Sequence, residues 1–169
     1  MTWTYIVGSS LFYGGIVTAY LFVVMITTSP RVWGYTDYSQ AVKAKVPPQT
    51  AAEKRLAWLI SIPWFLFTFG FPIYASLALK AMLGGEIPFW IALIHLLALF
   101  LAATLGDLVL LDWLVVSKIT PAFVILPGTE AQDYKDFSHH FKGHARSAPV
   151  MGLLAAVIAA AVSYPWPGV

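Results

Sequence analysis

Cysteine is absent from the 169-residue sequence. This absence excludes disulfides, thiol catalysis, iron–sulfur clusters and cysteine-based zinc sites. Any metal ligands must therefore come from histidine, aspartate or glutamate side chains. The sequence has only four histidines and eight acidic residues, so the positions of these few side chains decide which chemistry is open to the protein.

Charged residues are scarce. They make up 11% of the sequence, against about 25% in soluble proteins. Hydrophobic residues make up 59%, which predicts an integral membrane protein whose main partner is the lipid bilayer. The net charge of +2 is too small to indicate a nucleic-acid partner.

Four apolar segments are long enough, or nearly so, to cross a hydrocarbon core about 30 Å thick, which takes about 20 residues. They cover residues 5–27, 56–83, 87–116 and 150–166. The first lacks the positively charged start of a secretory signal, which favours a retained helix. The sequence thus predicts an all-α integral membrane protein, in which residues 1–169 form a single transmembrane domain built as a four-helix bundle.

Basic residues are concentrated in two connections, residues 28–55 and 117–148. These segments hold five and four basic residues, so nine of the ten fall on one side of the predicted bundle. Cytoplasmic loops are enriched in lysine and arginine. We therefore expect both connections in the cytoplasm and both termini on the non-cytoplasmic side of a multi-pass protein.

Two capping patterns predict helix starts within these connections. Thr50 and Glu53 lie three residues apart ahead of the second span, and Thr129 and Gln132 repeat the spacing. The second pattern predicts a helix from Glu130 to about residue 144. We interpret it as an extra cytoplasmic interfacial helix between spans 3 and 4.

This predicted helix carries the most chemically suggestive residues of the chain. Asp133, Asp136, His140 and His144 fall at i, i+3, i+7 and i+11, on one stripe of an α-helix. Carboxylates and imidazoles at this spacing are suitable ligands for a divalent metal ion or groups for acid–base catalysis. Asp112, near the end of the third span, could complete the set. An alternative is that the stripe forms only a solvated face with pH-dependent ion pairs.

Within this set, we expect Asp112, His140 and His144 to be the catalytic groups. Lys142 and Arg146 lie close by in the sequence and could hold an anionic headgroup. His139 points away from the stripe on an α-helix.

Two further polar residues lie inside the third span. Asp107 is about 16 Å below the membrane edge by helix rise, where a carboxylate is costly and must face the bundle. Five residues separate it from Asp112, a step of about 140° on an α-helix, so the two acids should not share a face. Asp107 is then either a packing residue or a proton- or cation-handling group. His95 is most simply a hydrogen-bonded packing residue, and as the only histidine within a span it excludes a haem held between two spans. We therefore expect no haem and no iron–sulfur cluster.

The leading hypothesis is a membrane protein with an Asp/His site at its cytoplasmic face. The site would bind a divalent metal ion or transfer protons, in a membrane enzyme acting on a lipid-soluble substrate. One alternative is an oligomeric proton or cation transporter that uses Asp107, with Pro63 and Pro72 bending the second span around a cavity. Another is a non-catalytic accessory subunit. Both a homo-oligomer and a complex with a protein partner are compatible with the sequence.

Overall fold

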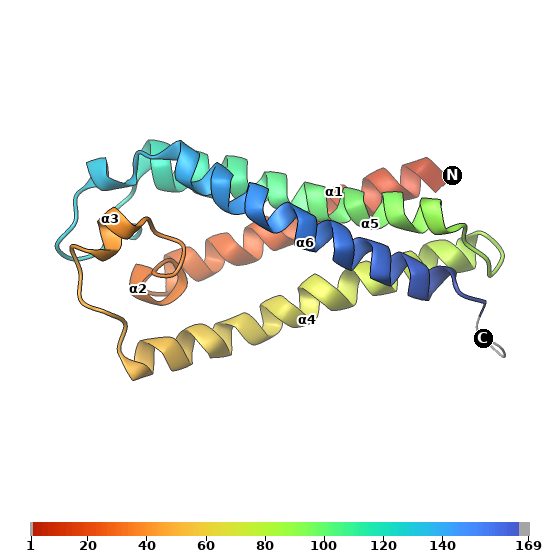
Figure 1. Ribbon diagram of the computed structural model, residues 1–169, viewed down its shortest axis with the longest axis horizontal. Coiled ribbons are helices and arrows are strands. Elements are labelled where there is room, and N and C mark those ends of the chain that lie inside the picture. Colours follow the sequence, from red (N-terminus) through yellow and green to blue (C-terminus); the bar gives the residue numbers. More distant parts are fainter. Residues whose placement is uncertain (1, 166–169) are drawn as a thin grey trace.

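The computed structural model describes residues 2–165, and every regular element in that range is a helix. The long helices lie side by side along the longest axis of the molecule (Figure 1); four helical segments are long enough to count among them. Each is long and apolar enough to cross a membrane. The elements in order are α1 (Thr2–Thr27), α2 (Pro30–Trp33), α3 (Gln40–Lys43), α4 (Ala51–Met82), α5 (Phe89–Leu105), η1 (Gly106–Ile119), η2 (Ala131–Tyr134) and α6 (Phe137–Ser163).

These helices confirm the prediction of an all-α protein with four segments compatible with membrane spans. The fourth span was expected to end at Trp166, which lies outside the described residues. Both ends of the described chain lie at one end of the bundle (Figure 1). The connections 28–50 and 120–136 lie at the opposite end, which we call the loop end.

The bundle centre is a close contact between α1 and the third span. Gly14 lies so near Ala102 that an added Cβ would sit 2.8 Å from the Ala102 carbonyl oxygen. One helical turn further along each helix, a Cβ on Gly106 would collide with the Thr18 hydroxyl. These small residues let the two backbones approach closely, as small residues do in membrane helix pairs.

Helix α4 begins with the predicted capping box. Thr50 accepts a hydrogen bond from the Glu53 backbone N–H (3.2 Å), and Glu53 accepts one from the Thr50 backbone N–H (2.7 Å). The buried residues of α4 all lie in its second half, from Pro72 to Leu79. The first half therefore packs loosely against the rest of the chain.

The loop end has a small core of its own, separate from the core between the long helices. Tyr38 is buried there and donates a hydrogen bond to the Val124 carbonyl (2.8 Å). Tyr134 packs edge-on against Tyr38 and accepts from the Leu126 backbone N–H (2.9 Å). These contacts join the two connections into a cap over one end of the bundle.

The predicted interfacial helix from Glu130 to residue 144 is wrong. Residues 131–134 form only a turn of 3₁₀ helix, and a break at Lys135 separates it from α6. Thr129 does not cap a helix, because its hydroxyl bonds to the Leu126 carbonyl and to Tyr134. Asp136 caps α6 instead, accepting from the backbone N–H groups of Ser138 and His139. The polar segment is thus the first part of the same helix that forms the fourth span.

The third span changes its helix type halfway. After α5, residues 106–119 form a π-helix, in which N–H groups bond to the carbonyl five residues back. At its end, the Thr120 N–H donates to the Val115 carbonyl (2.8 Å), a bond of this kind. π-Helices are rare, mostly single turns, and frequent at functional sites. This one is 14 residues long and contains both acids of the span.

Candidate metal centre

The π-helix brings Asp107 and Asp112 to the same side of the third span. In an α-helix, residues four apart are hydrogen-bonded neighbours on one face, whereas in a π-helix residues five apart take that place. The expectation that the two acids face apart is therefore wrong, because it assumed α-helical geometry. The prediction of a separate role for Asp107 depended on the two acids facing apart, which they do not.

The histidines come from the start of α6. Capping by Asp136 starts this helix, so that His140 and His144 lie one turn apart on the face toward the π-helix. Asp112 bonds to both: its Oδ1 is 3.1 Å from His140 Nδ1, and its Oδ2 is 3.0 Å from His144 Nε2. His144 Nε2 also lies 3.8 Å from Asp107 Oδ2.

Three side chains can offer atoms to one ion. One ligand atom each from Asp107, Asp112 and His144 lies within 4.8 Å of the other two. All three side chains are partly buried. Groups arranged in this way can either pair with each other, as they do here, or share a cation.

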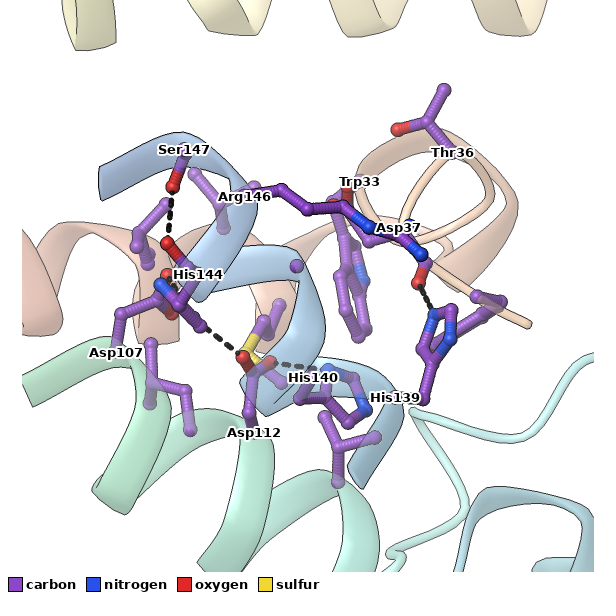
Figure 2. A pocket seen from close by; sticks show the side chains of 17 residues that line it. Trp33, Thr36, Asp37, Asp107, Asp112, His139, His140, His144, Arg146 and Ser147 are labelled. Atoms are coloured by element: carbon purple, nitrogen blue, oxygen red, sulfur yellow. Dashed lines mark hydrogen bonds and ion pairs between the residues drawn. The ribbon is translucent and has the colours of Figure 1, made fainter. Parts of the chain in front are cut away.

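A cavity of about 450 Å³ opens beside these atoms. Its walls come from α1, the segment around Asp37, the π-helix and α6. Figure 2 shows Asp112 between the two histidines and Arg146 extending over the cavity toward the Asp37 loop. His139 lies on that far wall, with its Nε2 2.7 Å from the Asp37 carbonyl oxygen.

Asp37 adds a third acid to the cavity wall. Asp37 is an exposed residue, although many protein atoms lie near its carboxyl group. Desolvation by these atoms, followed by the negative charge of Asp112, raises the pKa of Asp37 above its usual range. The acids around this cavity therefore repel one another, and a bound cation would relieve that repulsion.

The other predicted site residues lie apart from the three-residue group. Asp133 bonds to Lys45 Nζ (2.5 Å) and to the Glu130 backbone N–H (2.9 Å). Asp136 is occupied as the cap of α6. The stripe that joined both acids to the histidines required one continuous helix, and the break at Lys135 removes it. Of the two predicted anion-binding residues, Arg146 lines the cavity, whereas Lys142 does not.

His95 lies in the core between the long helices. It is fully buried, with Nε2 2.9 Å from the Ser9 hydroxyl and Nδ1 3.3 Å from the Ser76 hydroxyl. These bonds join α1, α4 and α5. Both ring nitrogens have a partner, so His95 has the contacts of a packing residue.

No protein-family model, curated protein or solved structure matches this chain. Function must therefore be argued from the site itself.

Asp37 and Asp107 were not predicted to belong to the site. Asp37 is the only acid among residues 28–52, in a connection otherwise interpreted through its basic residues. Asp107 was identified but assigned elsewhere. A search for acids and histidines at every spacing compatible with any helix type would have paired Asp107 with Asp112; Asp37 has no such signal.

Proposed function

We propose that this protein is a membrane protein that binds a divalent metal ion through Asp107, Asp112 and His144. The observation that carries the proposal is the convergence of their ligand atoms within 4.8 Å of one another. The three residues come from two helices far apart in the sequence. Pairing between neighbours on the surface of one helix therefore does not account for this convergence. Two carboxylates at one point are unfavourable without a cation or a shared proton.

The ligand set favours an ion that accepts both nitrogen and oxygen ligands, such as the borderline ion Zn²⁺ or the harder ion Mn²⁺. One imidazole and two carboxylates match the nitrogen and oxygen donors of such ions. Mg²⁺ and Ca²⁺ prefer shells of oxygen alone. The absence of cysteine removes softer ions that need thiolate ligands.

Three protein ligands leave part of the coordination shell open, which is the pattern of catalytic rather than structural zinc sites. The open part would face the adjacent cavity. His140 holds the second oxygen of Asp112 and would orient that ligand, as outer partners of metal ligands do. A metal ion in this place would supply Lewis acidity toward a substrate oxygen or a bound water. The reaction we infer is therefore acid–base or metal-assisted chemistry on a lipid-soluble substrate.

Metal binding to purified protein tests this proposal. Protein in lipid nanodiscs would be stripped with chelator, titrated with Zn²⁺ or Mn²⁺ by calorimetry, and analysed for bound metal. We expect one ion per chain and a metal-dependent rise in melting temperature. The matched variants are Asp112→Asn and Asp133→Asn, the latter removing an acid that the stripe prediction included. Loss of binding in the first alone supports the proposed site; no bound metal in the wild type refutes it.

Proton transfer is a second candidate, favoured by one observation. His144 Nε2 lies between Asp107 (3.8 Å) and Asp112 (3.0 Å), and Asp112 continues to His140 (3.1 Å). This series connects a residue of the third span with the loop end. Proton flux into liposomes that is abolished by Asp107→Asn supports the relay, and unchanged flux counts against it.

We also propose that the loop end faces the cytoplasm, from its basic residues. Because the native chain has no cysteine, single substitutions Ala131→Cys at the loop end and Glu86→Cys at the opposite end can be labelled individually. A membrane-impermeant maleimide applied to intact cells should label the second and not the first. The reverse pattern would invert the topology.

A further inference from the structure

The histidine-bearing start of α6 lies far from the part of that helix that packs into the core. The buried residues of α6 begin at Ala155, about 16 Å of helix rise beyond His144. Between them lies Pro149, which has no N–H group to donate to the carbonyl four residues back. Core packing and continuous helix hydrogen bonding therefore do not by themselves fix residues His140 to His144, which we call the histidine turn.

A tryptophan of the π-helix contacts the start of α6. The indole N–H of Trp113 donates a hydrogen bond to the Phe137 carbonyl oxygen (3.3 Å). The two rings also pack against each other, with centroids 6.3 Å apart. Trp113 directly follows the proposed ligand Asp112, and Phe137 is the first residue of α6. This contact therefore joins the neighbour of one ligand to the start of the helix that carries another.

Lys135 makes a second contact between the start of α6 and the π-helix. It lies two residues before α6, and its ammonium group donates to the Lys118 carbonyl (2.9 Å) and to the Thr120 hydroxyl (2.7 Å). The Thr120 hydroxyl in turn donates to the Val116 carbonyl (2.8 Å). These carbonyls belong to the last turn of the π-helix, where no later N–H group of the helix accepts the role of donor. Lys135 and Thr120 thus close the end of the π-helix.

The backbone at Thr120 shows that this junction is tightly specified. Its φ of 52° is the only positive φ of a non-glycine residue within residues 2–165. A β-branched residue is strained in this conformation, which persists only where the surroundings enforce it. The buried Thr120 hydroxyl is bonded on both sides, to Lys135 and to Val116. These bonds hold the strained residue in place.

We propose that Trp113 and Lys135 are positioning residues that hold the histidine turn against the π-helix. His144 is thereby kept within reach of an ion bound by Asp107 and Asp112. This inference rests on the proposed function, because such an ion needs ligands from both helices. A ligand that is held in place before the ion arrives loses less conformational entropy when the ion binds.

Zinc affinity in lipid nanodiscs tests this proposal. Trp113→Phe keeps an aromatic ring but loses the N–H donor, and Lys135→Met keeps most of the side-chain length but loses the ammonium group. We expect each change to weaken zinc binding about tenfold. Lys135→Arg keeps the charge and the donors, so its zinc affinity should stay within about threefold of the wild type.

Two variants of the same residue types serve as matched controls. Trp58 and Lys142 are exposed, so Trp58→Phe and Lys142→Met should change zinc affinity by less than about twofold. Lys142→Met removes the same positive charge as Lys135→Met. Loss of a positive charge by itself favours a cation. Weaker binding in Lys135→Met alone would therefore come from the lost hydrogen bonds.

A His144→Ala background separates positioning from a general structural effect. Without the imidazole, adding Lys135→Met should leave the residual zinc affinity within about twofold, as a double-mutant cycle would show. An equal loss of affinity with and without His144 would overturn the proposal. Trp113→Phe and Lys135→Met variants that bind zinc as the controls do would also overturn it.

A distance measurement on metal-free protein keeps the proposal distinct from the metal centre. Because the chain has no cysteine, nitroxide labels can be attached to Leu101→Cys and Phe141→Cys, two exposed positions. Electron–electron double resonance should show a narrow distance distribution in the parent protein and a broader one when Trp113→Phe and Lys135→Met are combined. An unchanged distribution would overturn the proposal. Broadening in a protein that binds no zinc would refute the metal centre and support the contacts that hold the histidine turn.

Discussion

Two histidine-centred clusters lie toward opposite ends of this bundle, and they differ in almost every physical respect. In the His95 cluster, His95 and Ser76 are fully buried and Ser9 is partly buried. The cluster contains no acid, and each ring nitrogen of His95 pairs with a serine hydroxyl. The cluster at the loop end has two histidines and two acids, is partly buried, and opens into a cavity.

The difference separates a structural site from a candidate functional one. Neutral groups that satisfy one another in a closed core stabilise the packing of helices and leave nothing free for a ligand. Acids that lie close together beside a cavity are unfavourable by themselves and gain from a cation. The same residue type, histidine, therefore has a different expected role at each end of the molecule.

The largest expected effect is on metal affinity. Asp112→Ala removes a proposed ligand and the partner of both histidines, so we expect the affinity for Zn²⁺ to fall by about 100-fold or more. Without metal, unfolding free energy should change by less than about 1 kcal/mol, since the loss of one acid also reduces repulsion. Calorimetry and denaturant unfolding in detergent measure the two quantities. A large stability loss with intact metal binding would make Asp112 a structural residue.

At the His95 cluster we expect the opposite result, a loss of stability without a loss of metal affinity. His95→Ala leaves a cavity and removes hydrogen bonds to Ser9 and Ser76, so we expect a loss of about 2–4 kcal/mol in unfolding free energy. Zinc affinity should remain within about twofold, because the cluster lies outside the proposed ligand shell. Denaturant unfolding and calorimetry measure these two quantities in His95→Ala. A strong effect on metal affinity would show that the two clusters are coupled.

A smaller effect is expected from the helix contact beside Asp107. In Gly106→Ala, the new Cβ would meet the Thr18 hydroxyl and push α1 away from the π-helix. We expect zinc affinity to fall about tenfold through displacement of Asp107. Thr18→Ala should restore most of that affinity in the double variant, as a double-mutant cycle would reveal. Equal affinities in the single and double variants would contradict a role for this contact.

The smallest effect is predicted for Asp37, which lines the cavity without belonging to the three-residue group. Asp37→Asn removes one negative charge near the ion, and we expect about threefold weaker zinc binding. The effect should shrink at high salt, because it depends on charge alone. A loss as large as that of Asp112→Ala would place Asp37 among the ligands.

The four long apolar helices could be predicted from the sequence because hydropathy is a strong, additive signal. The cap at Thr50 followed from local chemistry in the same way. The cluster was only half predicted: Asp112, His140 and His144 were identified together, but Asp107 was separated from them. That error came from applying the α-helical period to residues that form a π-helix.

The remaining errors have equally specific causes. Asp133 and Asp136 were placed beside the histidines by assuming one continuous helix, whereas Asp136 caps a new one. Asp37 reaches the cavity through the folding of the loop-end core, in which Tyr38 bonds to Val124. No local pattern encodes such a long-range contact.

We propose that the π-helix brings Asp107 and Asp112 to one ion together with His144. Anomalous diffraction from zinc-loaded crystals would locate that ion. We expect a single zinc peak about 2.0–2.2 Å from one oxygen of each acid and from His144 Nε2. A peak at Asp133 or Asp136, or no peak in protein that has been saturated with zinc, would contradict it.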